Sequence, residues 1–157
     1  MQWQSPTRGA LTFERMFEEV VGYMQAEPGA RYKLIIGTDS QAREDSTAFV
    51  TAVVVHRLGK GARYFYQRRQ QRKITSLRQK IFYETSLSLG LASRMAERLS
   101  ENGHSKLDVE IHLDVGTNGE TRELIREIVG MVTGSGFDAK IKPDSYGASK
   151  VADKYTK

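Results

Sequence analysis

The chain has 157 residues, of which 39% are hydrophobic and 27% are charged, with a net charge of +5 and no cysteine. These values predict one soluble globular domain over residues 1–157 with a hydrophobic core, and they exclude disulfides, zinc–thiolate sites and thiol nucleophiles. No apolar run approaches the roughly 18 residues of a membrane-spanning helix, and the N-terminus lacks a signal-peptide pattern. We therefore expect a cytoplasmic protein without a membrane partner.

The first part of the chain predicts an arm, a helix and three strands. Residues 1–30 would form the arm and the helix, with apolar residues at helical spacing and Thr12 as the N-cap. Trp3 lies in the arm, which we expect to be mobile. Three strands in hairpin series follow, and the first is almost wholly apolar, as a central buried strand should be. We expect these strands at 32–39, 47–58 and 62–72.

The remaining chain predicts alternating helices and strands that end in a short helix near the C-terminus. After the N-terminal helix, the order of elements is therefore β-β-β-α-β-α-β-α. This order predicts an α/β fold with a mixed sheet and helices on both faces. The elements are expected as a helix at about 76–101, a strand at 107–115, a helix at about 120–134, a strand at 137–142 and the final helix.

Four carboxylates that lie far apart in the sequence are predicted to meet. Asp39 and Asp114 each end an apolar run, at the carboxyl ends of strands that we expect to be neighbours, where ligand sites lie in such sheets. Glu84 interrupts the apolar stripe of the long helix, and Asp153 lies in the C-terminal segment. Carboxylates gathered in this way repel one another unless a cation holds them, and a divalent metal is the usual one.

Each of these acids also has a structural explanation that the sequence leaves open. Glu84 could form an ion pair with Arg78 or Lys80, and Asp153 could be a solvated helix carboxylate near the chain end. Asp144 is the other candidate for the fourth acid, although it could instead cap the final helix. We favour Asp153 over Asp144 as the ligand. His112 could reach the site, but a packed strand residue is the more common role.

The positive charge of the chain is concentrated in one stretch. Residues 60–80 contain eight lysines or arginines and no acid, whereas the rest of the chain has 16 basic and 19 acidic residues. Aromatic residues at 64–66 adjoin these charges, and a basic strand with aromatics suits a polyanion with stackable bases. The alternative is a solvated strand edge whose charges prevent aggregation. The residues predicted to bind nucleic acid are Arg68, Arg69, Arg72 and Lys73.

The order of elements resembles the ribonuclease H-like fold. The strand end at residues 37–40 looks like that fold's first catalytic aspartate, Asp39, although Asp-Ser-Gln replaces the usual Asp-Gly-Ser. Glu84 looks like its glutamate, Asp114 like its next aspartate, and Asp153 like the last acid on its C-terminal helix. Over residues 12–157, and most clearly in the tail, the chain is similar to the bacterial YkuK-type, ribonuclease H-like proteins.

This resemblance implies a nuclease that hydrolyses phosphodiester bonds with two Mg²⁺ or Mn²⁺ ions. Asp39 would bridge both ions, Glu84 and Asp114 would complete one site, and Asp153 or Asp144 would complete the other. Two other functions stay open: a nucleic-acid-binding module with a weak or inactive site, and a small-molecule phosphohydrolase that uses the same carboxylates. The sequence leaves open the choice among RNA, DNA and hybrid substrates, and the oligomeric state.

Overall fold

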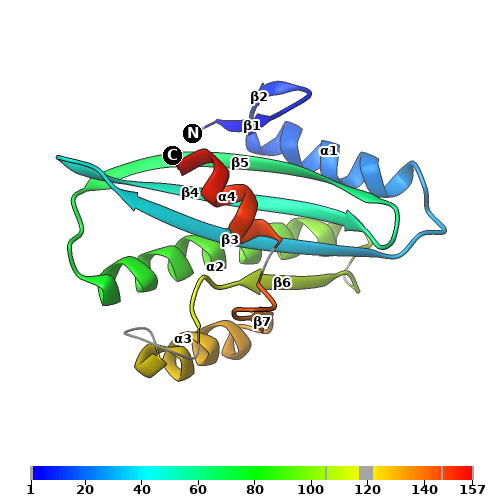
Figure 1. Ribbon diagram of the computed structural model, residues 1–157. Helices are drawn as coiled ribbons and strands as arrows, with labels where there is room; N and C mark the ends of the chain where they lie inside the picture. Colours follow the sequence, from blue (N-terminus) through cyan, green and yellow to red (C-terminus); the bar gives the residue numbers. More distant parts are fainter. Residues whose placement is uncertain (1, 105, 117–121, 146, 157) are drawn as a thin grey trace.

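The computed structural model describes residues 2–104, 106–116, 122–145 and 147–156, with only the backbone at 149 and 150. Over these ranges the strands form one seven-stranded sheet with the order β2-β1-β5-β4-β3-β6-β7 (Figure 1). The strands are β1 (Trp3–Ser5), β2 (Gly9–Leu11), β3 (Tyr32–Ala42), β4 (Ser46–Arg57), β5 (Gly61–Arg72), β6 (Asp108–His112) and β7 (Asp138–Lys140). The helices are α1 (Phe13–Gln25), α2 (Leu77–Glu101), α3 (Arg122–Gly134) and α4 (Ala148–Thr156).

The sheet is mixed, as the order of elements predicted. Strands β3, β4 and β5 are antiparallel neighbours, whereas β6 runs parallel to β3, and β7 runs parallel to β6. Strand β3 is apolar on both faces because Leu34 and Ile36 enter one hydrophobic core and Ile35 enters the other. The predicted α/β fold with helices on both faces of a mixed sheet is therefore confirmed.

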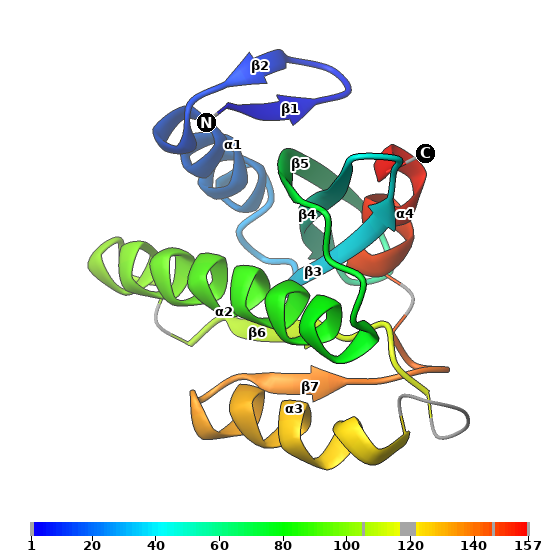
Figure 2. The same ribbon diagram turned by 90° about the vertical axis from the view of Figure 1, so that its left-hand side faces the viewer.

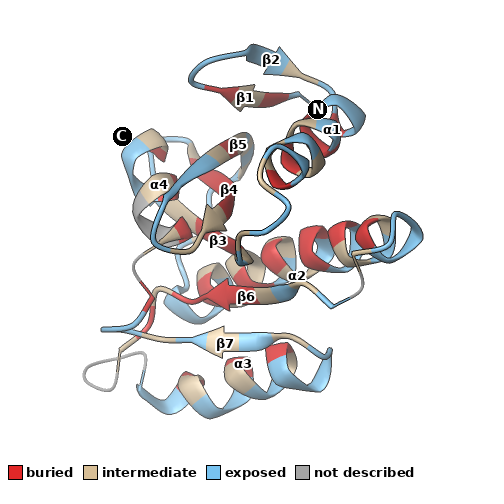
Figure 3. Ribbon diagram, turned by 90° about the vertical axis from the view of Figure 1, so that its right-hand side faces the viewer, coloured by how far each residue is buried: buried red, intermediate tan, exposed pale blue. Residues whose placement is uncertain are grey.

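Three helices cover one face of the sheet and the fourth covers the other (Figure 2). Apolar residues of α1, α2 and α3 pack with one face of β3, β4 and β6 in the larger core. Helix α4 packs Ala148 and Ala152 against Ile35, Val50 and Val54 on the opposite face. In Figure 3 the buried residues (red) follow the inner sides of α1 and α2 and run along β6. Strand β3 is thus sandwiched between α2 and α4.

The N-terminal arm forms a β-hairpin, so the expectation of a mobile arm was wrong. Strand β1 pairs with β2, and its Gln4 pairs with Tyr66 of β5. The side chain of Trp3 is only 3% exposed, and burial of an indole supplies much of the free energy that orders a short segment. Two strands of three residues are too short to show alternation in the sequence. Thr12 caps α1 as predicted, because its Oγ1 accepts a hydrogen bond from the Arg15 amide.

The strand boundaries differ from the expected ones where pairing continues beyond the apolar run. Strand β3 extends to residue 42 because it stays paired with β4 up to Ala42 and Thr47. Strand β6 ends at 112 rather than 115, and β7 covers only 138–140. Residues 120 and 121, the expected start of α3, lie outside the described residues. Within the described ranges, none of the helices has the length and apolar composition that crossing a membrane requires.

Candidate active site

Asp39 and Asp114 lie at the same level of the sheet. The last paired residues of the parallel strands β3 and β6 are Gly37 and His112, and each aspartate follows its paired residue by two positions. Because side chains alternate between faces along a strand, Asp39 lies on the face that α4 covers. The two carboxylates influence each other, since Asp114 is among the causes that raise the pKa of Asp39.

Glu84 reaches the site from α2, on the opposite face of β3. The hydroxyl of Ser40, the residue after Asp39, donates a hydrogen bond to Glu84 Oε2. The alternative ion pair with Arg78 does not form, because Arg78 Nη2 lies 3.1 Å from Glu127 Oε2 on α3. Burial is the largest influence on the pKa of Glu84 and raises it, whereas the charge of Lys80 lowers this pKa by a smaller amount.

Buried hydroxyl groups connect α2 to the sheet one turn away from Glu84. Thr38 Oγ1 lies 2.8 Å from Ser88 Oγ on α2 and 3.0 Å from Thr51 Oγ1 on β4. These three side chains are buried, so their hydrogen bonds offset the cost of removing the hydroxyls from water. Because these bonds hold α2 against β3, they also fix the position of Glu84 along the strand.

Helix α4 brings Asp153 to Asp39. The side chain of Asp153 is close enough to Asp39 to raise its pKa, and Thr156 Oγ1 lies 3.5 Å from Asp39 Oδ2. Tyr155 anchors the helix, because its ring stacks on Tyr66 of β5 with a centroid distance of 3.7 Å. The Tyr155 hydroxyl also lies 2.8 Å from the hydroxyl of Tyr64. Docking of Tyr155 on β5 therefore holds α4 in place, and with it Asp153 beside Asp39.

Two arginines bind the C-terminal end of α4, a contact that no pattern in the sequence predicts. Arg43 Nη2 donates to the Thr156 carbonyl at 2.5 Å, and Arg68 Nη2 donates to the Tyr155 carbonyl. Cations stabilise the last turn of a helix because its carbonyls lack intrahelical partners. Arg68, predicted to bind nucleic acid, therefore has a structural contact that fixes the helix carrying Asp153.

The predicted nucleic-acid-binding residues of β5 do not all share one face of the strand. Arg69 points to the opposite face of β5, since neighbouring strand residues alternate. Arg72 is exposed at the end of β5, and Lys73 Nζ lies 3.4 Å from the Glu44 carbonyl. The basic stretch thus divides between the α4 face and the α2 face of the sheet.

The pKa values of two acids are raised. Burial raises the pKa of Asp39 to about 6, with further contributions from the charges of Asp114 and Asp153. Burial raises the pKa of Glu84 to about 8, and the charges of Asp39 and Asp114 add to the effect. Both carboxylates are costly to ionise in the protein alone. A cation bound among them would remove this cost.

Lys142 supplies a positive charge at the edge of this cluster. Its Nζ lies 2.8 Å from Asp114 Oδ1, and the contact raises the pKa of the lysine, with a smaller contribution from Asp39. In the part of the chain that the structure describes, no three histidine, aspartate or glutamate side chains form a group that could hold a metal ion. The oxygen donors and the raised pKa values of Asp39 and Glu84 suit a divalent cation, but Asp114 is paired with Lys142.

Asp144 and His112 both line a second cavity, of about 510 Å³, and His112 also lines a small pocket together with Glu84 and Asp114. Asp144 is exposed and precedes the first residue of α4 by four positions, so it does not take the N-cap position. His112 is buried, with Nε2 at 3.1 Å from Glu110 Oε1 and Nδ1 accepting from the Gly147 amide at 3.3 Å. His112 is therefore a packed strand residue, and the structure brings Asp153 rather than Asp144 to Asp39.

The comparisons with known proteins agree with this fold. A family model described as Ribonuclease H-like matches residues 15–157. This chain belongs to the ribonuclease H-like family. It is also 40% identical to the uncharacterized protein YkuK of Bacillus subtilis (strain 168) over 158 positions. The alignment covers 94% of this chain and 92% of YkuK. The predicted resemblance to YkuK-type, ribonuclease H-like proteins is thus confirmed.

The raised pKa values predict how stability changes with pH in the absence of metal. Because Asp39 and Glu84 take up protons more readily in the folded than in the unfolded state, folding is favoured at low pH. Stability should fall as the pH rises through about 6 and then about 8. We expect a loss on the order of 1–3 kcal/mol in the free energy of unfolding between about pH 5 and about pH 8.

Urea denaturation in EDTA at several pH values measures this loss. Glu84→Gln should remove the larger part of the slope, whereas Glu127→Gln, which changes an exposed carboxylate on α3, should leave the slope unchanged. Adding Mg²⁺ or Mn²⁺ near pH 8 should restore stability to the wild type. A stability that rises with pH over this range would contradict the prediction.

Proposed function

We propose that this protein is a metal-dependent nuclease that hydrolyses phosphodiester bonds in nucleic acid. The observation that supports the proposal most strongly is the electrostatic contact of Asp39 with Asp114 and Asp153, which come from β3, the end of β6 and α4. Three chain segments each supply an acid, and the charges of Asp114 and Asp153 add to the cost of ionising Asp39. A structural role does not explain that cost, whereas a cation that binds a phosphate does.

Each acid of the cluster would have a distinct role. Asp39 is influenced by both other aspartates, so Asp39 would hold the Mg²⁺ or Mn²⁺ ions together with Asp114 on one side and Asp153 on the other. Glu84, which accepts a hydrogen bond from Ser40, would be a ligand of the same metal site as Asp114. When bound, the two ions would supply an activated hydroxide and stabilise the leaving 3′ oxygen.

Lys142 would change partners when the site is loaded. Its ammonium now neutralises Asp114, a contact that a divalent cation with two charges would displace. Lys142 is exposed and could then turn its charge to the substrate phosphate. In this proposal the lysine keeps the acids from repelling one another before metal binds and contacts the phosphate afterwards.

A nucleic-acid-binding module with an inactive site is the second candidate. Two observations favour it: the ion pair between Lys142 and Asp114, and the lack of a three-residue metal group among the described residues. In that case the acids would repel the nucleic acid, and binding would depend on basic residues such as Arg69 and Arg72. Metal affinity distinguishes the two candidates, because a binding module has no need of it.

The proposal is tested by incubating labelled single-stranded, duplex, hybrid and branched substrates with the protein and Mg²⁺ or Mn²⁺. Cleavage that EDTA stops is expected for at least one substrate. The double variant Asp39→Asn/Asp114→Asn, purified in the same way, controls for contaminating nucleases. If wild type and double variant cleave equally, or neither cleaves any substrate while both still bind nucleic acid, the nuclease proposal is wrong.

A further inference from the structure

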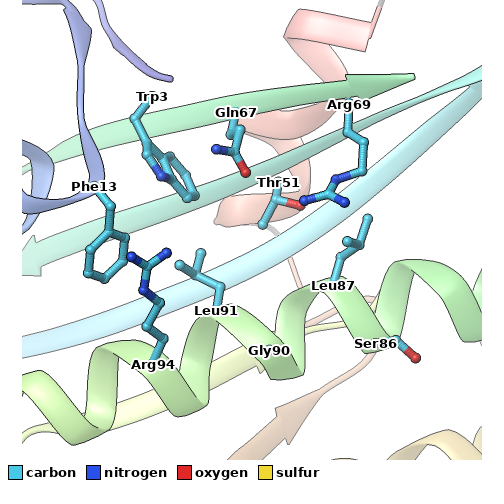
Figure 4. A pocket seen from close by; sticks show the side chains of 10 residues that line it. All are labelled: Trp3, Phe13, Thr51, Gln67, Arg69, Ser86, Leu87, Gly90, Leu91 and Arg94. Carbon is cyan, nitrogen blue, oxygen red and sulfur yellow. The ribbon is translucent and has the colours of Figure 1, made fainter. Parts of the chain in front are cut away.

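A cavity of about 410 Å³ lies between α2 and β5, on the face of the sheet opposite α4 (Figure 4). Gln67 and Arg69 of β5 line one side, Leu91 of α2 lines the other, and Trp3 and Phe13 close one end. Among the described residues, the acids of the candidate active site do not line it. Its volume lies within the range of small-ligand sites, which runs from about 300 to 1,000 Å³.

Two guanidinium groups face this cavity without a carboxylate partner. Arg94 of α2 lies over the ring of Phe13, 3.5 Å from its centroid, and this stacking fixes the guanidinium in place. Arg69 enters from the opposite end, beside Thr51 (Figure 4). In the described part of the chain neither arginine forms an ion pair, since the nearby Glu14 pairs with Arg98. The charge of Arg94 also acts on the exposed Glu14, but among the described residues neither arginine is neutralised by an ion pair at the cavity. Two such cations at one cavity indicate an anionic ligand, and the guanidinium fork matches a phosphate.

The floor of the cavity is apolar and open. Leu87 and Leu91 project from α2 toward β5, with Gly90 between them (Figure 4). A glycine inside a helix is destabilising relative to alanine. Packing does not require it here, because a Cβ at Gly90 would meet no atom within 4 Å. The bare backbone at Gly90 therefore leaves space for a flat apolar group above the helix.

We propose that this cavity binds a nucleotide, with the phosphate between Arg69 and Arg94 and the base against Leu87 and Leu91. The hydroxyl of Thr51 and the amide of Gln67 would supply hydrogen bonds. The nucleotide is either a free molecule or one residue of a nucleic-acid strand. In the second case the cavity would hold a part of the strand away from the point of cleavage, and the inference then rests on the proposed function.

Calorimetric titration in EDTA tests the proposal, because metal-dependent cleavage cannot occur there and binding is measured by itself. Adenosine 5′-monophosphate is the probe, and adenosine and inorganic phosphate are titrated separately. We expect saturable binding of the nucleotide and much weaker binding of its two parts. Arg69→Ala and Arg94→Ala should each weaken binding by about ten- to a hundredfold. Arg126→Ala, which removes an exposed arginine from α3, should not.

A blocking variant separates loss of charge from loss of space. Gly90→Gln keeps both arginines, adds a side chain where no protein atom stands in the way, and should abolish binding. Gly130→Gln is the matched control, because Gly130 also lies within a helix and also has no atom within 4 Å of a built Cβ. Both substitutions should raise helix stability, so a loss of binding in only the first cannot come from misfolding.

The outcomes assign the source of the nucleotide or overturn the proposal. Binding of the mononucleotide that both arginine variants and Gly90→Gln weaken supports a free nucleotide. If the mononucleotide fails but a short single-stranded oligoadenylate binds with the same dependence on these residues, the site holds part of a strand. If neither ligand responds to these variants, or if inorganic phosphate binds as tightly as the mononucleotide, the assignment is wrong. A protein that binds here but never cleaves nucleic acid would refute only the nuclease.

Discussion

Replacing Asp39 with asparagine should abolish metal-dependent cleavage and at the same time stabilise the metal-free protein. The charges of both Asp114 and Asp153 act on Asp39, so in the proposed metal site the substitution would remove a ligand shared by the two ions. Outer-shell partners of a metal site are worth about 10–100-fold, and a bridging ligand should cost more than about 100-fold in kcat. Stability should rise because asparagine carries no charge to desolvate.

The opposite direction of the two effects makes this prediction specific. Near neutral pH, where Asp39 with its pKa of about 6 is largely ionised, we expect Asp39→Asn to raise the free energy of unfolding in EDTA by about 1 kcal/mol. Urea denaturation and initial cleavage rates measure the two effects. Asp138→Asn, at an exposed position on β7, should change neither. A variant that loses both activity and stability would indicate that Asp39 is a structural acid.

The positions of the acids followed from patterns that act within one element. An apolar run predicts a buried strand whatever its partners are, so the runs that lead to Asp39 and Asp114 were recognisable. Glu84 stood out because it broke a helical stripe. Neighbouring parallel strands then place their ends at the same edge, which is why the influence of Asp114 on Asp39 could be expected without coordinates.

The contacts that hold the acids in place could not be predicted in the same way. Arg43 and Arg68 reach the carbonyls of α4 across 113 and 87 positions of sequence, and no local pattern specifies such a pair. The division of the basic stretch between two faces of the sheet could have been predicted from the sequence, because Arg68 and Arg69 are consecutive in a strand and must point to opposite faces. The spacing of Ala148, Ala152 and Tyr155 was likewise a readable signal, since it marks the side of α4 that packs on the sheet.

Replacing Tyr155 with alanine should release α4 and with it Asp153. The ring of Tyr155 stacks on Tyr66, and its hydroxyl contacts Tyr64. Loss of a partly buried aromatic ring and of its stacking should weaken docking of α4 by about 2 kcal/mol. We expect faster amide hydrogen exchange throughout α4, and a fall in kcat because Asp153 is no longer held beside Asp39.

Tyr155→Phe is the matched control for this prediction. It keeps the stacked ring and removes only the hydroxyl contact, so it should cost about 1 kcal/mol or less and retain most of the cleavage activity. The pKa of Asp39, followed by NMR, adds a readout that overall destabilisation would not move. Because Asp153 raises this pKa, undocking of α4 should lower it in Tyr155→Ala and leave it raised in Tyr155→Phe. If both variants keep the Asp39 pKa and the α4 protection of wild type, then the tyrosine stack does not position Asp153, and the two arginines at the end of α4 must do so alone.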